Sequence, residues 1–282
     1  ILFDDTLKEN KLTYFPEYIN FTADLNSNPI PIKNNGPWGT IIFDWRSLRH
    51  ACKDNSSLLT LGYNTAIFSF LPRIKNLYHL MNMDGIEWKR QKWSWPIKIW
   101  FYLNEILGCL LTNHLIADHP GIKQHLLRWT KPTKISMIPY GSDLVEEADK
   151  SLIEAYGLEA GKYLIVIARP EPENSILEIV EAFSARERGI KLVILGNYRT
   201  DTNSYHSKVV ESTNNEIIML GAIYDDNIVK ALRLYSMAYV HGHQVGGTNP
   251  SLVEAMGCGC AVIAHDNHFN RWVAGDEALY FS

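Results

Sequence analysis

The sequence predicts an α/β protein built from two doubly wound domains, and three observations lead to this fold class. The chain has 282 residues, which is more than a single hydrophobic core usually serves. Its second half alternates short, β-branched apolar runs with segments of helical periodicity. This alternation repeats several times, and a repeated strand–helix–strand order is typical of a parallel sheet covered by helices on both faces.

The strands expected in the second half are apolar runs of the kind that a sheet buries on both faces. They are 163–168, 191–195, 216–220, 237–241 and 261–264. Two intervening segments have apolar residues spaced as on one buried face of a helix. These residues are Ile176, Ile179, Val180 and Phe183, followed by Ile228, Leu232 and Tyr235.

The first half shows the same order less clearly. Its expected strands are 40–43, 57–61, 77–83, 114–117 and 135–138. The motif IPYGSD (138–143) then leads through a charged stretch to a new helix, as a link between domains does. We therefore expect one domain over residues 1–142 and a second over residues 143–282.

Composition excludes several classes of partner. With 27 Lys and Arg against 31 Asp and Glu, the net charge is −4, so no basic field is available for a nucleic acid. Four cysteines are too few for a disulfide scaffold and suit a reducing compartment. Cys258 and Cys260 form a C-x-C without a second pair at zinc-binding spacing, so we expect no metal site.

We expect a cytoplasmic protein. No signal peptide opens the sequence, and the most apolar stretch, 95–111, contains Lys98 and Glu105, which a membrane-spanning helix avoids. Four tryptophans at 88, 93, 95 and 100 alternate with basic residues. This pattern suits sugar stacking, peripheral contact with the inner face of the plasma membrane, or an ordinary core helix.

The segment 241–264 is the most informative for chemistry. A strand ends at His241, a Gly-rich turn follows, and Asn249 and Pro250 open a helix as N-cap and first residue. Amides around 247–249 and the positive end of the helix dipole suit a diphosphate. Glu254, one turn further along, can accept hydrogen bonds from ribose hydroxyls. The alternative is a tight turn before a helix with a surface glutamate.

Two other loops follow expected strands. Arg169 ends the first strand of the second domain, where doubly wound sheets bind ligands, and its guanidinium suits phosphate. Arg169 could equally form an ion pair with Glu171 or Glu173. In the first half, NMDGIEWKR places four charged residues on a loop at a strand end, either beside a cleft or as a solvated rim. They are Asp84, Glu87, Lys89 and Arg90.

Five motifs in order resemble family-four glycosyltransferases of the GT-B fold, and within them a bacterial polysaccharide subgroup that includes rhamnosyltransferases. The motifs are MDGIEWKRQKW (83–93), IPYGSD (138–143), RPEPEN (169–174), GGTNPSLVEAM (246–256) and IAHDNHFNR (263–271). The resemblance implies two Rossmann-like domains facing a cleft, with the acceptor side in 1–142 and the donor in 143–282. The strand with a Gly-rich loop that opens such proteins, and the helix that closes them, are not evident in this sequence.

Carried over by position, the resemblance makes Arg169 the phosphate-binding arginine and Glu254 the ribose-binding glutamate. Two positions depart, because Gly246 stands where the family has its first glutamate and Asn174 where it has a phosphate-binding lysine. His243, Asn249 or the first domain are expected to compensate. The expected donor-binding set is Arg169, Asn174, Gly246, Gly247, Thr248, Asn249, Pro250, Ser251 and Glu254, and the expected catalytic set is Asp84, Arg169 and His243.

The resemblance implies a retaining glycosyltransferase that needs no metal or other cofactor. It would transfer sugar from a UDP- or dTDP-sugar to a glycan or lipid-linked glycan in surface polysaccharide synthesis. Two alternatives remain open, a sugar-nucleotide epimerase and a non-catalytic nucleotide-sugar-binding subunit. A nicotinamide dehydrogenase is disfavoured, since no G-x-G-x-x-G follows the first strand.

Overall fold

The computed structural model describes residues 2–4, 28–31 and 36–282, which belong to two compact units. The first unit ends at Ile138, and the second extends from Pro139 to Ser282. The sequence places the boundary a few residues later, between 142 and 143. One short segment, Arg90–Lys92, packs with the second unit although it comes from the first half of the chain.

The first unit contains a four-stranded parallel sheet of order β3-β4-β5-β6. Its strands are β3 Leu58–Leu61, β4 His79–Asn82, β5 His114–Ala117 and β6 Ile135–Met137. Its α-helices are α2 Pro37–Ala51, α3 Phe70–Ile74, α4 Trp95–Leu111 and α5 Pro120–Leu126. Short 3-10 turns occur at η2 Ala66–Ser69, η3 Glu87–Lys89 and η4 Pro132–Lys134, and β1 Leu2–Asp4 pairs in parallel with β2 Asn28–Ile30.

The prediction of a strand at 40–43 is wrong, because these residues lie inside helix α2. A run of three apolar residues, two of them β-branched, is compatible with either structure. The helix is decided by its surroundings. Pro37 stands in the first turn, where proline is favoured, and Leu48 packs with Cys52, Leu58 and Leu77 in a small core.

Helix α4 lies close against the central strands of the first unit. Gly108 makes this approach possible, since a Cβ at this position would lie 3.0 Å from the Met81 sulfur. On the same helix, the Asn104 side chain accepts a hydrogen bond from the Ile67 amide at 2.8 Å. Among the described residues, no helix is both long and apolar enough to cross a membrane.

The second unit contains a six-stranded parallel sheet of order β12-β11-β10-β7-β8-β9. Its strands are β7 Tyr163–Ile167, β8 Lys191–Leu195, β9 Ile217–Gly221, β10 Ala238–His241, β11 Val262–His265 and β12 Leu279–Phe281. Its helices are α6 Ser151–Glu154, α7 Ile176–Ser184, α8 Ser204–Glu211, α9 Asp226–Leu234, α10 Pro250–Gly257 and α11 His268–Ala274, with a 3-10 turn η5 Pro172–Asn174. Read from β9, the strand order is the 3-2-1-4-5-6 order of the doubly wound fold.

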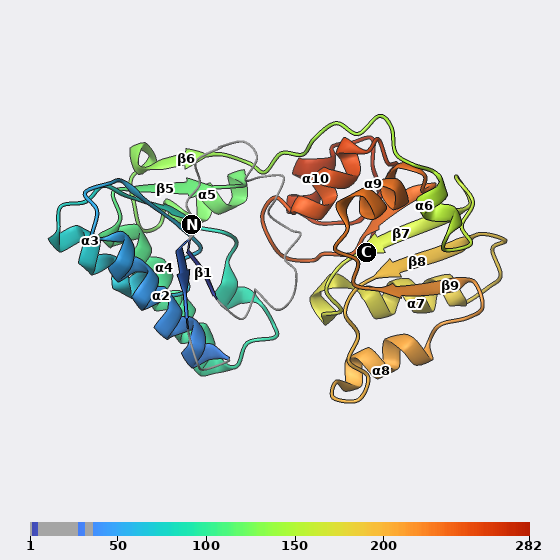
Figure 1. Cartoon of the computed structure of the whole chain (residues 1–282), viewed down its shortest axis with the longest axis horizontal. Helices are drawn as coiled ribbons and strands as arrows, with labels where there is room; N and C mark the ends of the chain where they lie inside the picture. The colour runs from blue at the N-terminus through green and yellow to red at the C-terminus, as the bar shows by residue number, and fades with distance from the viewer. Residues whose placement is uncertain (1, 5–27, 32–35) are drawn as a thin grey trace. The chain divides into compact units, whose positions relative to one another are not determined.

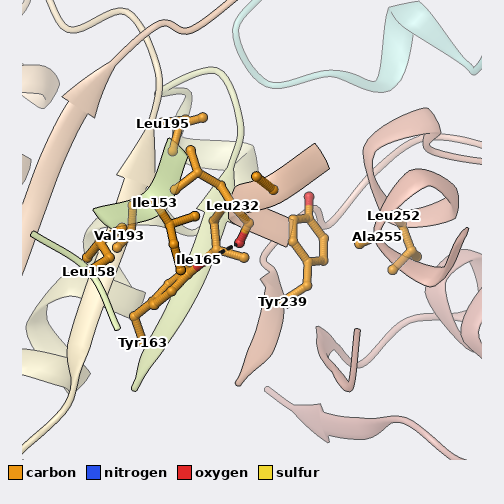
Figure 2. Packing of buried hydrophobic residues seen from close by; sticks show 11 residues of the cluster. Ile153, Leu158, Tyr163, Ile165, Val193, Leu195, Leu232, Tyr239, Leu252 and Ala255 are labelled. Carbon is orange, nitrogen blue, oxygen red and sulfur yellow. Dashed lines mark hydrogen bonds between the residues drawn. The ribbon is translucent and has the colours of Figure 1, made fainter. Parts of the chain in front are cut away.

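Both faces of this sheet are buried, because successive strand residues point to opposite sides. Tyr163 and Ile165 face a core shared with α9 and α10, whereas Val166 faces a core shared with α7. Figure 1 shows α7 on one side of β7–β9 and α9 and α10 on the other. Figure 2 shows the first core, where the Tyr163 hydroxyl donates a hydrogen bond to the Leu232 carbonyl at 2.7 Å.

Candidate functional site

The centre of the second unit is the point at which the winding of the sheet reverses. Strands β7 and β10 are neighbours there, with Tyr239 in register with Ile165. From β7 the chain winds outward through β8 and β9, and from β10 it winds the opposite way through β11 and β12. Open α/β sheets bind ligands at the carboxyl ends of the two strands that flank such a point. The loops after β7 and β10 are therefore the candidate site.

The loop after β7 presents Arg169 to solvent. The Arg169 carbonyl accepts hydrogen bonds from the Glu171 amide at 2.7 Å and from the Asn174 side-chain nitrogen at 2.8 Å. Asn174, which the sequence places among the donor-binding residues, is only 3% exposed. Its observed contact is thus with the loop itself, and it shapes the turn that carries Arg169.

The loops after β7 and β10 are tied together at Gly242. A Cβ at this position would lie 2.2 Å from the Asn174 carbonyl oxygen, so only glycine fits. The Ser175 hydroxyl donates to the Gly242 carbonyl at 2.8 Å and accepts from the Gln244 side chain at 2.9 Å. The Gln244 amide in turn donates to the Glu173 carbonyl at 2.9 Å. These bonds fix the two loops relative to each other.

Two histidines stack at the end of β10. The rings of His241 and His243 lie 4.3 Å apart and nearly parallel, and a buried ring nitrogen of each has no hydrogen-bond partner among the described residues. Burial, together with the positive charges of Arg169 and Arg90, lowers the pKa of His243 to about 3. The imidazole is therefore neutral near pH 7 and poorly suited as a general base, although it can still exchange hydrogen bonds with a ligand.

Helix α10 begins as the sequence predicts. The Asn249 side chain caps it by accepting from the Ser251 amide at 3.0 Å, and Pro250 is its first residue. The Ser251 hydroxyl lies 2.8 Å from the Tyr239 hydroxyl and donates to the Ile167 carbonyl at 3.4 Å. The N-terminus of α10 is thus held against the carboxyl end of β7, two residues before Arg169.

The Gly-rich turn before α10 is open on one side. Gly246 has φ +145°, which side chains rarely adopt, and no atom lies within 4 Å of the position that its Cβ would occupy. Thr248 is buried. The turn therefore presents backbone rather than a carboxylate at 246.

Glu254 lies on α10, one turn beyond its start, and is paired with an arginine of α9. Its Oε2 accepts a hydrogen bond from the Arg233 guanidinium at 2.5 Å, and the same nitrogen of Arg233 donates to the Ser251 hydroxyl at 3.1 Å. The Arg233 side chain is 6% exposed and that of Glu254 is 38% exposed. A buried cation thus orients a carboxylate that remains open to solvent.

A second ion pair joins the Arg90–Lys92 segment to the loop after β7. Arg90 donates to Glu173 Oε1 from Nε at 2.7 Å and also from Nη2. The Glu173 side chain is 4% exposed, and its other oxygen has no hydrogen-bond partner among the described residues. The sequence offered Glu173 as a partner of Arg169, whereas the structure pairs it with Arg90.

Comparison with known protein families finds a match for most of this unit. Residues 150–278 match the family described as Glycosyl transferases group 1. We call the second unit the group 1 domain after this match. Residues 49–143 match a domain of unknown function, DUF1972. The family-four assignment and the rhamnosyltransferase subgroup remain predictions.

Solved structures resemble the chain over most of its length. HepE of Anabaena, solved in complex with UDP and glucose, has a TM-score of 0.72 at 13% identity, covering 95% of this chain and 75% of HepE. Sucrose-phosphate synthase from Thermosynechococcus elongatus has a TM-score of 0.72 at 17% identity, covering 89% and 69%. A glycosyltransferase from Rickettsia africae has a TM-score of 0.65 at 18% identity, covering 94% and 72%. These similarities confirm the predicted α/β fold of GT-B type. No curated protein sequence matches the chain.

Three of the expected cleft residues follow β4 in the first unit, outside the group 1 domain. Asp84 is exposed, and its amide donates to the Asn82 side chain at 3.4 Å. The Glu87 amide donates to the Tyr63 hydroxyl at 2.7 Å, and the Lys89 ammonium lies 5.6 Å from the centre of the Trp88 ring.

The sequence did not predict a role for Arg233 or Lys92, and it offered Arg169 rather than Arg90 as the partner of Glu173. Arg233 and Glu173 have partners far along the chain, so no local spacing predicts these pairs. Lys92 lies in the motif at 83–93, but nothing in the sequence distinguishes it from the other basic residues of that motif. Within the described ranges, no three His, Cys, Asp or Glu side chains are grouped as for a metal ion, and Cys260 instead donates to the Arg233 carbonyl at 3.1 Å.

Proposed function

We propose that the chain is a retaining, metal-independent glycosyltransferase that uses a UDP- or dTDP-sugar. The observation that carries this proposal is the convergence, at the switch point of the group 1 domain, of Arg169, the N-terminus of α10 and the oriented carboxylate of Glu254. A nucleoside diphosphate presents phosphates, which suit the guanidinium and the helix N-terminus, and a ribose diol, which suits the carboxylate. HepE of Anabaena, solved in complexes with UDP and with UDP-glucose, supports uridine as one nucleoside.

In this proposal Arg169 and the amides of residues 247–249 hold the diphosphate. Both groups would stabilise the negative charge that grows on the diphosphate as the bond to the sugar breaks, and preorganised charges of this kind are usually the largest catalytic contribution. The Arg169 guanidinium and the helix amides would therefore stabilise the diphosphate charge that a divalent metal ion stabilises in metal-dependent enzymes. The leaving phosphate itself would receive the proton of the acceptor hydroxyl.

The sugar would lie beside the histidine pair and the open turn at Gly246. Because His243 is neutral near pH 7, its part is to exchange a hydrogen bond with the sugar rather than to accept a proton. Asp84, with Glu87 and Lys89, would act on the acceptor, which we propose is a glycan or a lipid-linked glycan of a surface polysaccharide. Such a reaction would take place in the cytoplasm, at or near the inner face of the plasma membrane.

A binding and turnover experiment tests the proposal. We expect UDP or dTDP to raise the unfolding temperature in the presence of EDTA, since a ligand at 100 times its Kd adds about 2.7 kcal/mol of stability. A UDP- or dTDP-sugar should then lose its sugar to a glycan acceptor with retention of the anomeric configuration. Interconversion of the nucleotide sugar without acceptor would indicate an epimerase, and binding without turnover a non-catalytic subunit. No binding of any nucleoside diphosphate would refute the proposal.

A further inference from the structure

The loop after β7, which forms part of the diphosphate site proposed above, carries little positive charge. Arg169 is the sole arginine or lysine of the loop 168–175. A nucleoside diphosphate carries negative charge on both phosphates, and each phosphate is best met by a cation. Asn174 is neutral and buried, and its amide nitrogen donates to the Arg169 carbonyl. A second cation therefore has to come from another segment.

The Arg90–Lys92 segment lies at this loop. Arg90 reaches Glu173, the residue immediately before Asn174, with two of its nitrogens. The contact is well shielded, because 17% of the Arg90 side chain and 4% of the Glu173 side chain are exposed. A charge pair with this burial and double contact holds its segment in a defined place. It joins residues that are 83 positions apart in the sequence.

Arg90 also changes the balance of charge at the loop. Without a partner, the buried carboxylate of Glu173 would repel a phosphate. Paired with Arg90, it contributes little net charge to the loop. Lys92 is exposed and stands two residues after the anchor.

The environment of Lys92 is positive. Partial burial lowers the pKa of its ammonium, and the charges of Arg90 and Arg169 lower it in the same direction. Glu171 and Glu173 act in the opposite direction and do not cancel the effect. Crowded like charges destabilise a site until an anion is bound.

We propose that Lys92 supplies the second cation of the diphosphate site, with Arg90 as the residue that anchors its segment to Glu173. This inference rests on the proposed function and names the phosphate contacts of that same site. Donor binding would then require a segment from the first half of the sequence. The phosphate site of the group 1 domain would be incomplete in residues 139–282 alone.

The test is the substitution Lys92→Met, which keeps an unbranched side chain only one atom shorter and removes its charge. Because Lys92 is exposed, the variant is expected to fold, and its unfolding temperature without ligand should not fall. Lys162→Met is the matched control, since Lys162 is an exposed lysine that precedes β7 at the opposite end of the same strand. Calorimetry would measure binding of UDP and uridine, and of dTDP and thymidine in parallel.

We expect Lys92→Met to weaken UDP or dTDP by about tenfold or more, as for the loss of a charged hydrogen bond. Affinity for the bare nucleoside should be unchanged, and the difference from wild type should shrink at high salt. The control should bind as wild type does.

Equal affinity of Lys92→Met and wild type for the diphosphate would overturn the inference and leave the proposed function standing. Equal weakening of diphosphate and nucleoside would also overturn it, because the lost contact would not be to phosphate. Failure of the wild-type protein to bind any nucleoside diphosphate would refute the proposed function and this inference together.

Discussion

Replacing Glu254 by glutamine probes the proposed ribose contact of the group 1 domain with a minimal change of shape. In the structure, Oε2 of Glu254 accepts a hydrogen bond from Arg233 at 2.5 Å, and the carboxylate is 38% exposed. A guanidinium can only donate, so the single carbonyl oxygen of the glutamine should turn to Arg233. The glutamine NH₂ group then faces the position proposed for the ribose hydroxyls.

The magnitude follows from that exchange. An acceptor for ribose hydroxyls is replaced by a donor, and a mismatch of this kind costs about 1–3 kcal/mol, or roughly fivefold to 150-fold in nucleotide affinity. The fold should survive, because the buried guanidinium of Arg233 keeps a hydrogen bond to the glutamine oxygen and its hydrogen bond to the Ser251 hydroxyl.

The assay compares UDP with its 2′,3′-dideoxy analogue by calorimetry. Wild type should prefer the ribose form, whereas Glu254→Gln should bind both about equally. Glu181→Gln, an exposed glutamate on α7, serves as the control and should behave as wild type. If Glu254→Gln discriminates between the two nucleotides as strongly as wild type does, the ribose role is wrong.

Three further predictions follow from the same geometry. Arg169→Ala should weaken UDP by about 1.5–3 kcal/mol but leave uridine unchanged in calorimetry, and equal losses would place Arg169 away from the phosphates. Gly242→Ala should lower the free energy of unfolding by about 2 kcal/mol or more in urea titrations, since its Cβ would lie 2.2 Å from the Asn174 carbonyl oxygen; an unchanged midpoint would mean that the loops separate easily. The folded-state pKa of His243, about 3, lies below its ordinary value of 6.5, so the unfolded chain binds the additional proton and stability falls as the pH drops through this range. In the His243→Asn variant, the free energy of unfolding should fall less steeply as the pH drops, by up to about 1.4 kcal/mol per pH unit. If the variant and wild type show the same dependence of unfolding free energy on pH, the assigned pKa is wrong.

Local sequence accounts for most of the second unit. Every predicted strand of residues 143–282 lies within one residue of the observed strand at each end, and 191–195 coincides with β8. The four apolar residues of the 176–183 spacing are all buried in α7. Strong periodicity succeeds here because the central strands β7, β8 and β10 are largely buried on both faces and helices such as α7 are buried on one.

The first half was less predictable where apolar runs are short. Residues 40–43 form part of α2, and Pro37 in its first turn was a helix signal that the β-branched residues obscured. The strands that flank this helix in the sequence, β2 and β3, are also short. Short strands carry too few residues for alternation to be distinguished from helical spacing.

The sequence by itself determined where the candidate ligand-binding loops would lie, because strand ends, a Gly-rich turn and the cap formed by Asn249 and Pro250 are local features. Only the tertiary structure decided which charges meet there. Arg90 joins Glu173 across 83 positions, and Arg233 joins Glu254 across 21. Such pairs depend on which strands become neighbours at the centre of the sheet, and that choice is made by the packing of whole elements rather than by the residues adjacent in the chain.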